Sequence, residues 1–262
     1  MPRIDELVRA MEHIAPTRLA ADWDNVGLLV HTHDHVARIG LCIDLTQAVL
    51  QELIDTDVDT IIAYHPPIFR GLKRFAGRTA SERVVMSLLQ RNLNVYSPHT
   101  ALDAAKDGMN DWLLRGLGDV TDVRAIEPSE APDVGMGRLA ALTTPANLSV
   151  IVDRVKAHLG LNVVRVAATE RHHSGASIKT VAVCPGAGGS LFASLRGPDL
   201  YLTGEMRHHD VLAKVSAGAA VILTDHTNTE RGYLPVLAER LKAALDVPII
   251  VSAVDADPLR VV

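Results

Sequence analysis

Residues 58–67 read VDTIIAYHPP, an apolar run that ends abruptly in a tyrosine, a histidine and two prolines. The β-branched residues of this run are typical of a buried strand. Neither proline can donate a backbone hydrogen bond, so the strand ends there. Pro66 also favours an extended backbone at His65. The stretch therefore predicts a strand that presents His65 in a fixed orientation at its carboxyl end.

Three further polar clusters follow apolar runs in the same way. They are SPHTALD at 97–103, TGEMRHHD at 203–210 and TDHTNTE at 224–230. Helix-like segments separate the strand-like runs, which indicates an α/β fold with a mainly parallel sheet. Ligands bind beyond the carboxyl ends of the strands in such sheets. We therefore expect the histidines and carboxylates of the four clusters to share one site.

The rest of the chain shows the same alternation. The expected helices lie near 3–13, 47–56, 79–91, 105–116, 147–159 and 207–217, with one more near the C-terminus. The expected strands are 37–45, 58–64, 92–97, 137–144, 178–184, 199–205, 219–225 and 247–254. A segment containing proline and glycine, 127–137, is typical of a junction. WDNVGL at 23–28 predicts a turn, and PGAGGS at 185–190 predicts a Gly-rich turn or, alternatively, an anion site.

Composition limits the classes of function. The chain has 262 residues, enough for one large or two modest domains, and 48% of them are apolar. The formal net charge of −5 gives no electrostatic basis for binding nucleic acid or acidic membranes. No signal peptide or membrane-spanning run is visible. Cys42 and Cys184 lie in apolar runs, which favours buried reduced thiols and a cytoplasmic setting.

The polar clusters carry the ligands that divalent transition metals prefer. Histidine nitrogen combined with carboxylate oxygen suits Zn²⁺, Mn²⁺, Fe²⁺ or Co²⁺, and carboxylates that bridge suit a two-metal centre. Structural alternatives stay open. Thr227 and Glu230 have the spacing of a capping box, although Pro235 fits the start of the next helix better. Thr100 is a candidate cap for the helix that follows it, and Asp103 suits the first turn of that helix.

The motifs taken together resemble the NIF-three-like family, whose members are often labelled GTP cyclohydrolase I type 2 homologues. The resemblance extends over nearly the whole chain, through WDNVGLLV, YHPPIF, YSPHTALDAAKDGMNDWL, TGEMRHHD, TDHTNTERGYL and VDADPLRVV. The later motifs are most similar to the animal-type branch. The resemblance implies two α/β lobes of three layers each, with the ligand site at strand carboxyl ends between them. One lobe would comprise 1–126 and 231–262, and the other 127–230.

The resemblance also implies a homohexamer with one or two divalent metal ions (Zn, Mn or Fe) in each chain. By position, the metal ligands are His65, Asp103, His226 and Glu230. Many bacterial relatives have two adjacent histidines where this chain has Tyr64 and His65, so Tyr64 departs from the pattern.

Two classes of function are compatible with such a site. The first is a metal-dependent hydrolase of an unknown small molecule, with His99 as a proton-transfer group and His209 as a further candidate. The second is a non-catalytic metal carrier or a ring-shaped scaffold for protein partners. A DNA-binding regulator is disfavoured by the net negative charge, and we expect neither a nucleic acid nor a membrane as partner.

Overall fold

The computed structural model describes residues 1–71 and 74–260, which form two compact units. The first unit comprises Met1–Leu102 and Tyr233–Ala256, and the second comprises Asp103–Gly232 with the residues from Asp257 onward. Both units combine helices with sheets that contain parallel strands, so the predicted α/β fold is confirmed. Within the described residues, every helix is too short or too polar to cross a membrane.

The first unit is built on a five-stranded sheet with the order β1-β4-β3-β2-β13. Its strands are β1 (Gly27–Val30), β2 (Ile39–Cys42), β3 (Thr60–Ala63), β4 (Asn94–Ser97) and β13 (Ile249–Val251). All neighbours pair in parallel except β1 with β4. Because β2, β3 and β4 are buried along their whole length, they read as continuous apolar runs in the sequence.

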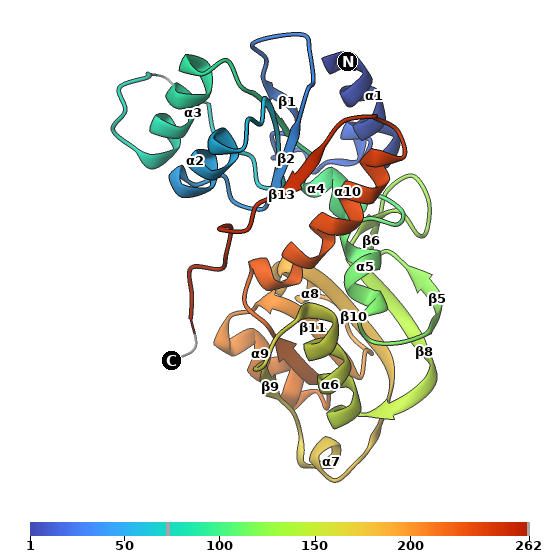
Figure 1. Cartoon of the computed structure of the whole chain (residues 1–262). Coiled ribbons are helices and arrows are strands. Elements are labelled where there is room, and N and C mark those ends of the chain that lie inside the picture. Colours follow the sequence, from blue (N-terminus) through green and yellow to red (C-terminus); the bar gives the residue numbers. More distant parts are fainter. Residues whose placement is uncertain (72–73, 261–262) are drawn as a thin grey trace. The chain divides into compact units, whose positions relative to one another are not determined.

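Helices cover both faces of this sheet (Figure 1). The helices are α1 (Ile4–Ile14), α2 (Gln47–Asp55), α3 (Ala80–Gln90) and α10 (Leu234–Lys242), with a short 3₁₀ turn at Thr17–Leu19. Helices α2 and α3 pack on one face, where Leu53 and Leu88 meet the strand residue Ile61. Helices α1 and α10 contact each other on the opposite face. The first unit is therefore a three-layer arrangement.

The second unit contains a six-stranded sheet with the order β5-β8-β10-β11-β12-β9. The strands are β5 (Val120–Arg124), β8 (Arg138–Asn147), β9 (Arg165–Ala167), β10 (Ser177–Ala187), β11 (Leu200–Glu205) and β12 (Ala220–Leu223). The three strands β10, β11 and β12 are parallel, and the other neighbours are antiparallel. The predicted junction at 127–137 contains a small antiparallel pair, β6 (Glu127–Pro128) and β7 (Gly135–Met136).

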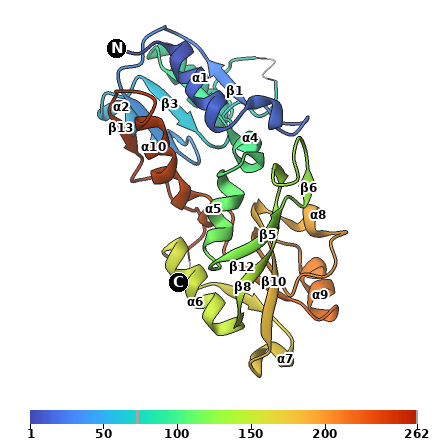
Figure 2. The same cartoon turned by 90° about the vertical axis from the view of Figure 1, so that its right-hand side faces the viewer.

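Helices also lie on both faces of the second sheet (Figure 2). They are α5 (Met109–Arg115), α6 (Leu148–Leu159), α7 (Glu170–His173), α8 (Gly189–Phe192) and α9 (His208–Ser216). Helices α8 and α9 pack on one face, where Phe192 contacts Tyr201. Helices α5 and α6 lie on the other face. Asn147 caps α6 by accepting a hydrogen bond from the amide of Val150.

A buried arginine ties the second unit together. The side chain of Arg138 is 0% exposed, and its Nε lies 2.5 Å from Oδ1 of Asp111. Its other nitrogens donate to the carbonyl oxygens of Gly135, Gly137 and Ala105. Burying a guanidinium is unfavourable unless its donors are satisfied, and here one side chain joins α5, β7 and the start of β8.

One local prediction about helix capping is wrong, and one alternative left open by the sequence is excluded. Helix α4 (His99–Ala104) begins before Thr100, and the Thr100 hydroxyl donates to Asp24 instead of capping the helix. The residues from Thr227 to Thr229 form a 3₁₀ turn, and the Thr227 hydroxyl donates to Asp257, so the capping-box interpretation fails. Pro235 does lie at the start of α10, as predicted. The turn predicted at 23–28 runs into a strand that was not predicted, β1.

Candidate metal centre

His65 lies just beyond the end of β3, and a carboxylate that follows the neighbouring strand holds its ring. Nδ1 of His65 is 2.9 Å from Oδ1 of Asp44, which follows the carboxyl end of β2. The amide of His65 donates to the carbonyl oxygen of Ile43, which continues the β2–β3 pairing. With Nδ1 at Asp44, the candidate ligand atom of His65 is Nε2. A carboxylate at the second ring nitrogen is typical of histidines that bind metals.

His226 has a similar environment in the second unit. Its Nδ1 is 3.2 Å from Oε2 of Glu205, the last residue of β11, and its Nε2 is 3.5 Å from Oε1 of Glu230. The side chain of Glu230 is only 2% exposed. Thr229 fixes the turn between the two, because its hydroxyl donates to the carbonyl oxygen of His226. Nε2 of His226 and Oε1 of Glu230 thus face each other and are candidate donors to one cation.

Gly186 leaves space over these two ligand atoms. A Cβ atom added to Gly186 would lie 2.8 Å from Nε2 of His226 and 2.9 Å from Oε1 of Glu230. The Gly186 backbone has a φ of +60°, which favours glycine. Its amide donates to the Thr229 hydroxyl at 2.7 Å, so the loop is held in place. The absence of a side chain and the nitrogen–oxygen donor pair both fit a divalent metal ion.

Hydrogen bonds in the same loop distinguish the two interpretations of PGAGGS, a Gly-rich turn and an anion site. The amide of Gly188 donates to the Thr203 hydroxyl, and that hydroxyl donates to the carbonyl oxygen of Gly186. These backbone groups are satisfied within the protein, which supports the interpretation of PGAGGS as a Gly-rich turn. Its contribution to the candidate centre is the space at Gly186.

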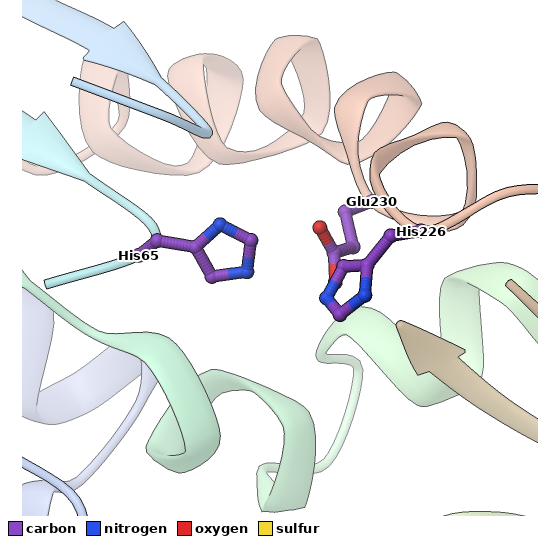
Figure 3. Close-up of side chains that lie close together, drawn as sticks. All are labelled: His65, His226 and Glu230. Atoms are coloured by element: carbon purple, nitrogen blue, oxygen red, sulfur yellow. The ribbon is translucent and has the colours of Figure 1, made fainter. Parts of the chain in front are cut away.

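Figure 3 shows the three side chains that have the chemistry to hold a metal ion, His65, His226 and Glu230. His65 belongs to the first unit, and His226 and Glu230 belong to the second. Asp103, the fourth predicted ligand, lies in α4 and is not part of this group. Burial raises the pKa of the Cys184 thiol well above its usual range, and the charges of Asp103 and Glu230 raise it further. The charges of Asp103 and Glu230 therefore both act on the Cys184 thiol of the second unit.

His99 is held by a buried carboxylate. Its Nδ1 is 2.8 Å from Oδ1 of Asp24, whose side chain is 0% exposed. Burial raises the pKa of Asp24, but hydrogen bonds from His99 and Thr100 outweigh this effect, so the pKa lies below its usual value. The backbone of His99 has a φ of +25°, a conformation that non-glycine residues rarely adopt. The Asp24 carboxylate thus fixes the imidazole in one orientation.

Aromatic rings surround His99 within the first unit. The ring centroids of Tyr64 and His65 lie 5.4 and 5.3 Å from that of His99, both in edge-on arrangements. Tyr64 is 2% exposed. Trp23 and Phe69 also contact His99, at 6.1 and 6.4 Å. The roles of Tyr64 and His99 stay predictions, but both residues lie next to His65.

The histidine pair of TGEMRHHD has a different environment. His208 and His209 open α9, are exposed, and contact each other edge-on with ring centroids 5.3 Å apart. Neither belongs to the group that could hold a metal. From that motif, Glu205 contacts a candidate ligand instead.

Sequence reasoning missed the carboxylates that orient the histidines, Asp24 and Asp44, as well as the close approach of Gly186. Asp44 did carry a signal, because it follows an apolar strand as the four clusters do. Asp24 lies in a motif that was interpreted only as a turn. Gly186 gave no distinct signal, since its importance depends on a close approach to His226 and Glu230, at least 40 positions further along the chain.

The chain is similar to known proteins over nearly its whole length. Residues 2–258 match the family described as Duf34/NIF3 (NGG1p interacting factor 3). The chain is 41% identical to the Protein NIF3 homolog of Schizosaccharomyces pombe, over 97% of this chain and 96% of that one. It is 33% identical to human NIF3-like protein 1, over 98% of this chain and 92% of that one.

A solved structure shows the same fold. The Bacillus cereus protein related to NIF3 superposes with a TM-score of 0.85 at 20% identity, and the match covers 100% of this chain and 99% of that one. The resemblance inferred from the sequence motifs is therefore confirmed: the chain belongs to the Duf34/NIF3 family.

Proposed function

We propose that the protein is a metal-dependent hydrolase of a small molecule, with His65, Asp103, His226 and Glu230 binding one or two divalent ions. One observation carries the proposal: both candidate histidine ligands have Nδ1 against a carboxylate, Asp44 for His65 and Glu205 for His226. This pairing fixes the ring and raises the basicity of the opposite nitrogen. Gly186 supports it by leaving room at His226 and Glu230.

The chain's own residues would divide the chemistry among them. A bound divalent ion supplies Lewis-acid activation of a carbonyl or phosphoryl oxygen. Asp44 and Glu205 hold the ligand histidines. His99 receives and returns a proton at Nε2, while Asp24 keeps Nδ1 fixed. Tyr64 and Trp23 pack against His99 and limit its access to water.

The alternative is a non-catalytic metal carrier or scaffold. It is favoured by one observation, the tyrosine at position 64, because a site with one imidazole fewer holds a second ion less firmly. We further propose a cytoplasmic homohexamer, as the family resemblance implies. Light scattering after size-exclusion chromatography measures the molar mass directly, and a monomer would contradict the hexamer.

Metal content measured by mass spectrometry on the untagged protein tests the metal centre. The variants are His65→Ala and Glu230→Ala, with His13→Ala and Glu239→Ala as exposed controls whose folding is checked by circular dichroism. A metal content of about two ions per chain that falls only in His65→Ala and Glu230→Ala supports a two-metal hydrolase. About one ion favours the carrier. Unchanged metal content in both ligand variants, or no metal after incubation with Zn²⁺, Mn²⁺ or Fe²⁺, would refute the centre.

Turnover separates the hydrolase from the carrier. A panel of phosphoesters, amides and nucleotides is incubated with metal-loaded protein and with the His99→Ala variant. Hydrolysis that is lost in His99→Ala while the metal content is retained supports a proton-transfer role. Binding of metal without turnover of any class supports the carrier.

A further inference from the structure

A cavity of about 820 Å³ lies within the first unit and has His65 in its wall. The first turn of α2, the first turn of α3 and the loop after His65 form the rest of the wall. Asp44, which holds His65, also lines the cavity. The volume falls in the range of small-molecule sites. A ligand in this cavity would therefore touch the residue pair that we assign to the metal centre.

The cavity wall is predominantly apolar. Its hydrophobic lining consists of Leu45, Ala48, Pro66, Pro67, Phe69, Ala80 and Val84. Phe69 is 45% exposed and its ring centroid lies 5.9 Å from that of Trp23, which is 63% exposed. Aromatic rings exposed side by side are typical of binding sites, because their surface is stabilised when a ligand covers it. The wall is thus suited to a flat apolar group.

Arg70 supplies the positive charge of this wall. It is the one lysine or arginine among the described residues that line the cavity. Its guanidinium makes no hydrogen bond or ion pair with any residue that the structure describes. Asp44, the acidic group of the same wall, is engaged by His65. An arginine without a partner at the edge of an apolar cavity pairs readily with a phosphate or carboxylate.

We propose that this cavity binds the non-reacting part of the substrate, and that the substrate is a small aromatic molecule with an anionic group held by Arg70. The inference rests on the proposed function, because it assigns the substrate class of the same site. Phosphate and carboxylate are both anions that a guanidinium binds through paired hydrogen bonds. The test below distinguishes between them.

Isothermal titration calorimetry on the full chain as purified tests the cavity with four probes. They are 1-naphthyl phosphate, 1-naphthoate, 1-naphthol and inorganic phosphate. We expect a naphthyl anion to bind at least tenfold more tightly than naphthol or inorganic phosphate, since only it meets both the apolar wall and Arg70. The tighter of the two naphthyl anions identifies the preferred anionic group. Equal affinity for all four probes, or no binding of any, would overturn the proposal.

Matched variants locate the binding. Ala48→Trp fills the cavity from the exposed first turn of α2, while Gln51→Trp adds the same side chain to the same helix outside the cavity lining. Arg70→Ala removes the charge, and Arg78→Ala removes an exposed arginine elsewhere. We expect Ala48→Trp to abolish binding and Arg70→Ala to weaken it about tenfold, with both controls unchanged. Binding that is the same in Ala48→Trp as in Gln51→Trp would contradict the cavity.

Glu230→Ala separates this inference from the proposed function. Glu230 belongs to the second unit and does not line the cavity. Unchanged probe binding in Glu230→Ala supports the cavity, even if the wild-type protein contains no metal and the hydrolase proposal fails. Loss of probe binding in Glu230→Ala shows that the probe binds through a metal, which overturns the cavity and leaves the metal centre standing.

Discussion

Nδ1 of His65 and Oδ1 of Asp44 are 2.9 Å apart, and the two residues follow neighbouring parallel strands at the same edge of the first sheet. The pairing positions the imidazole through a contact across the sheet, not through the residues beside it in the chain. A substitution of Asp44 therefore tests the metal centre without removing any candidate ligand.

Asp44→Asn should weaken metal binding by about 10- to 100-fold, because a neutral amide polarises the His65 ring less than a carboxylate does. Competition with a chromophoric chelator measures the affinity for Zn²⁺ or Mn²⁺. Asp55→Asn, an exposed change on α2, serves as the control. Equal affinities in the two variants would show that Asp44 has no role in a metal centre.

Gly186→Ala should lose the metal because the new Cβ would occupy the space over His226 and Glu230. Gly160→Ala is a close control, since Gly160 also has a positive φ, +68°, but nothing lies within 4 Å of its added Cβ. Both variants should lose roughly 1 kcal/mol of unfolding free energy from backbone strain, and Gly186→Ala should lose more because its Cβ would lie within 3 Å of His226 and Glu230. Metal content by mass spectrometry should fall only in Gly186→Ala, and a similar content in both variants would count against the centre.

Asp24→Asn should destabilise the protein by roughly 1–3 kcal/mol near neutral pH, because the charged acceptor of His99 and Thr100 is lost. The pKa of Asp24 is lowered by folding, so its carboxylate stabilises the native state above the unfolded pKa of about 4. That contribution is lost as the pH falls through the lower folded pKa. Urea unfolding at several pH values should show a difference from wild type that is constant above about pH 4 and shrinks below it.

The exposed neighbouring change Asp22→Asn controls for the loss of one negative charge. A difference between wild type and Asp24→Asn that is independent of pH would mean that the ionisation of Asp24 does not contribute to stability.

Arg138→Met should cost roughly 3–5 kcal/mol of unfolding free energy, since it leaves Asp111 and several carbonyl oxygens of the second unit without their donor. Thermal and urea unfolding report the loss. Asp111→Asn, which keeps an acceptor for the guanidinium, should cost less. If Arg138→Met were as stable as wild type, the buried network would be of no consequence for the fold.

The sequence predicted those parts of the site that depend on local pattern. The strand before His65 and its end at Pro66 follow from residues within a few positions of each other, as does the start of α10 at Pro235. The strand-end position of His226 was visible for the same reason. Even the failed capping box at Thr227 follows this rule, because the hydroxyl is used by Asp257, 30 residues further along.

What the sequence did not predict depends on which strands are neighbours. Asp44 acts on His65 because β2 lies beside β3, and Glu205 acts on His226 because β11 lies beside β12. Asp24 reaches His99 over 75 residues of chain. A periodic pattern predicts that a strand exists, but not its partner, so contacts across a sheet are not determined by local pattern.

The interrupted first unit has a consequence for synthesis on the ribosome. Strand β13 pairs with β2, and Asp255 accepts a hydrogen bond from the amide of Ile43, 212 residues earlier. The edge of β2 that faces β13 therefore stays unpaired until residues 249–251 have been made. All strands of the second sheet lie between residues 120 and 223, so that sheet can form while the first is still incomplete. The first sheet, which needs β13, is therefore the later of the two to receive all its strands.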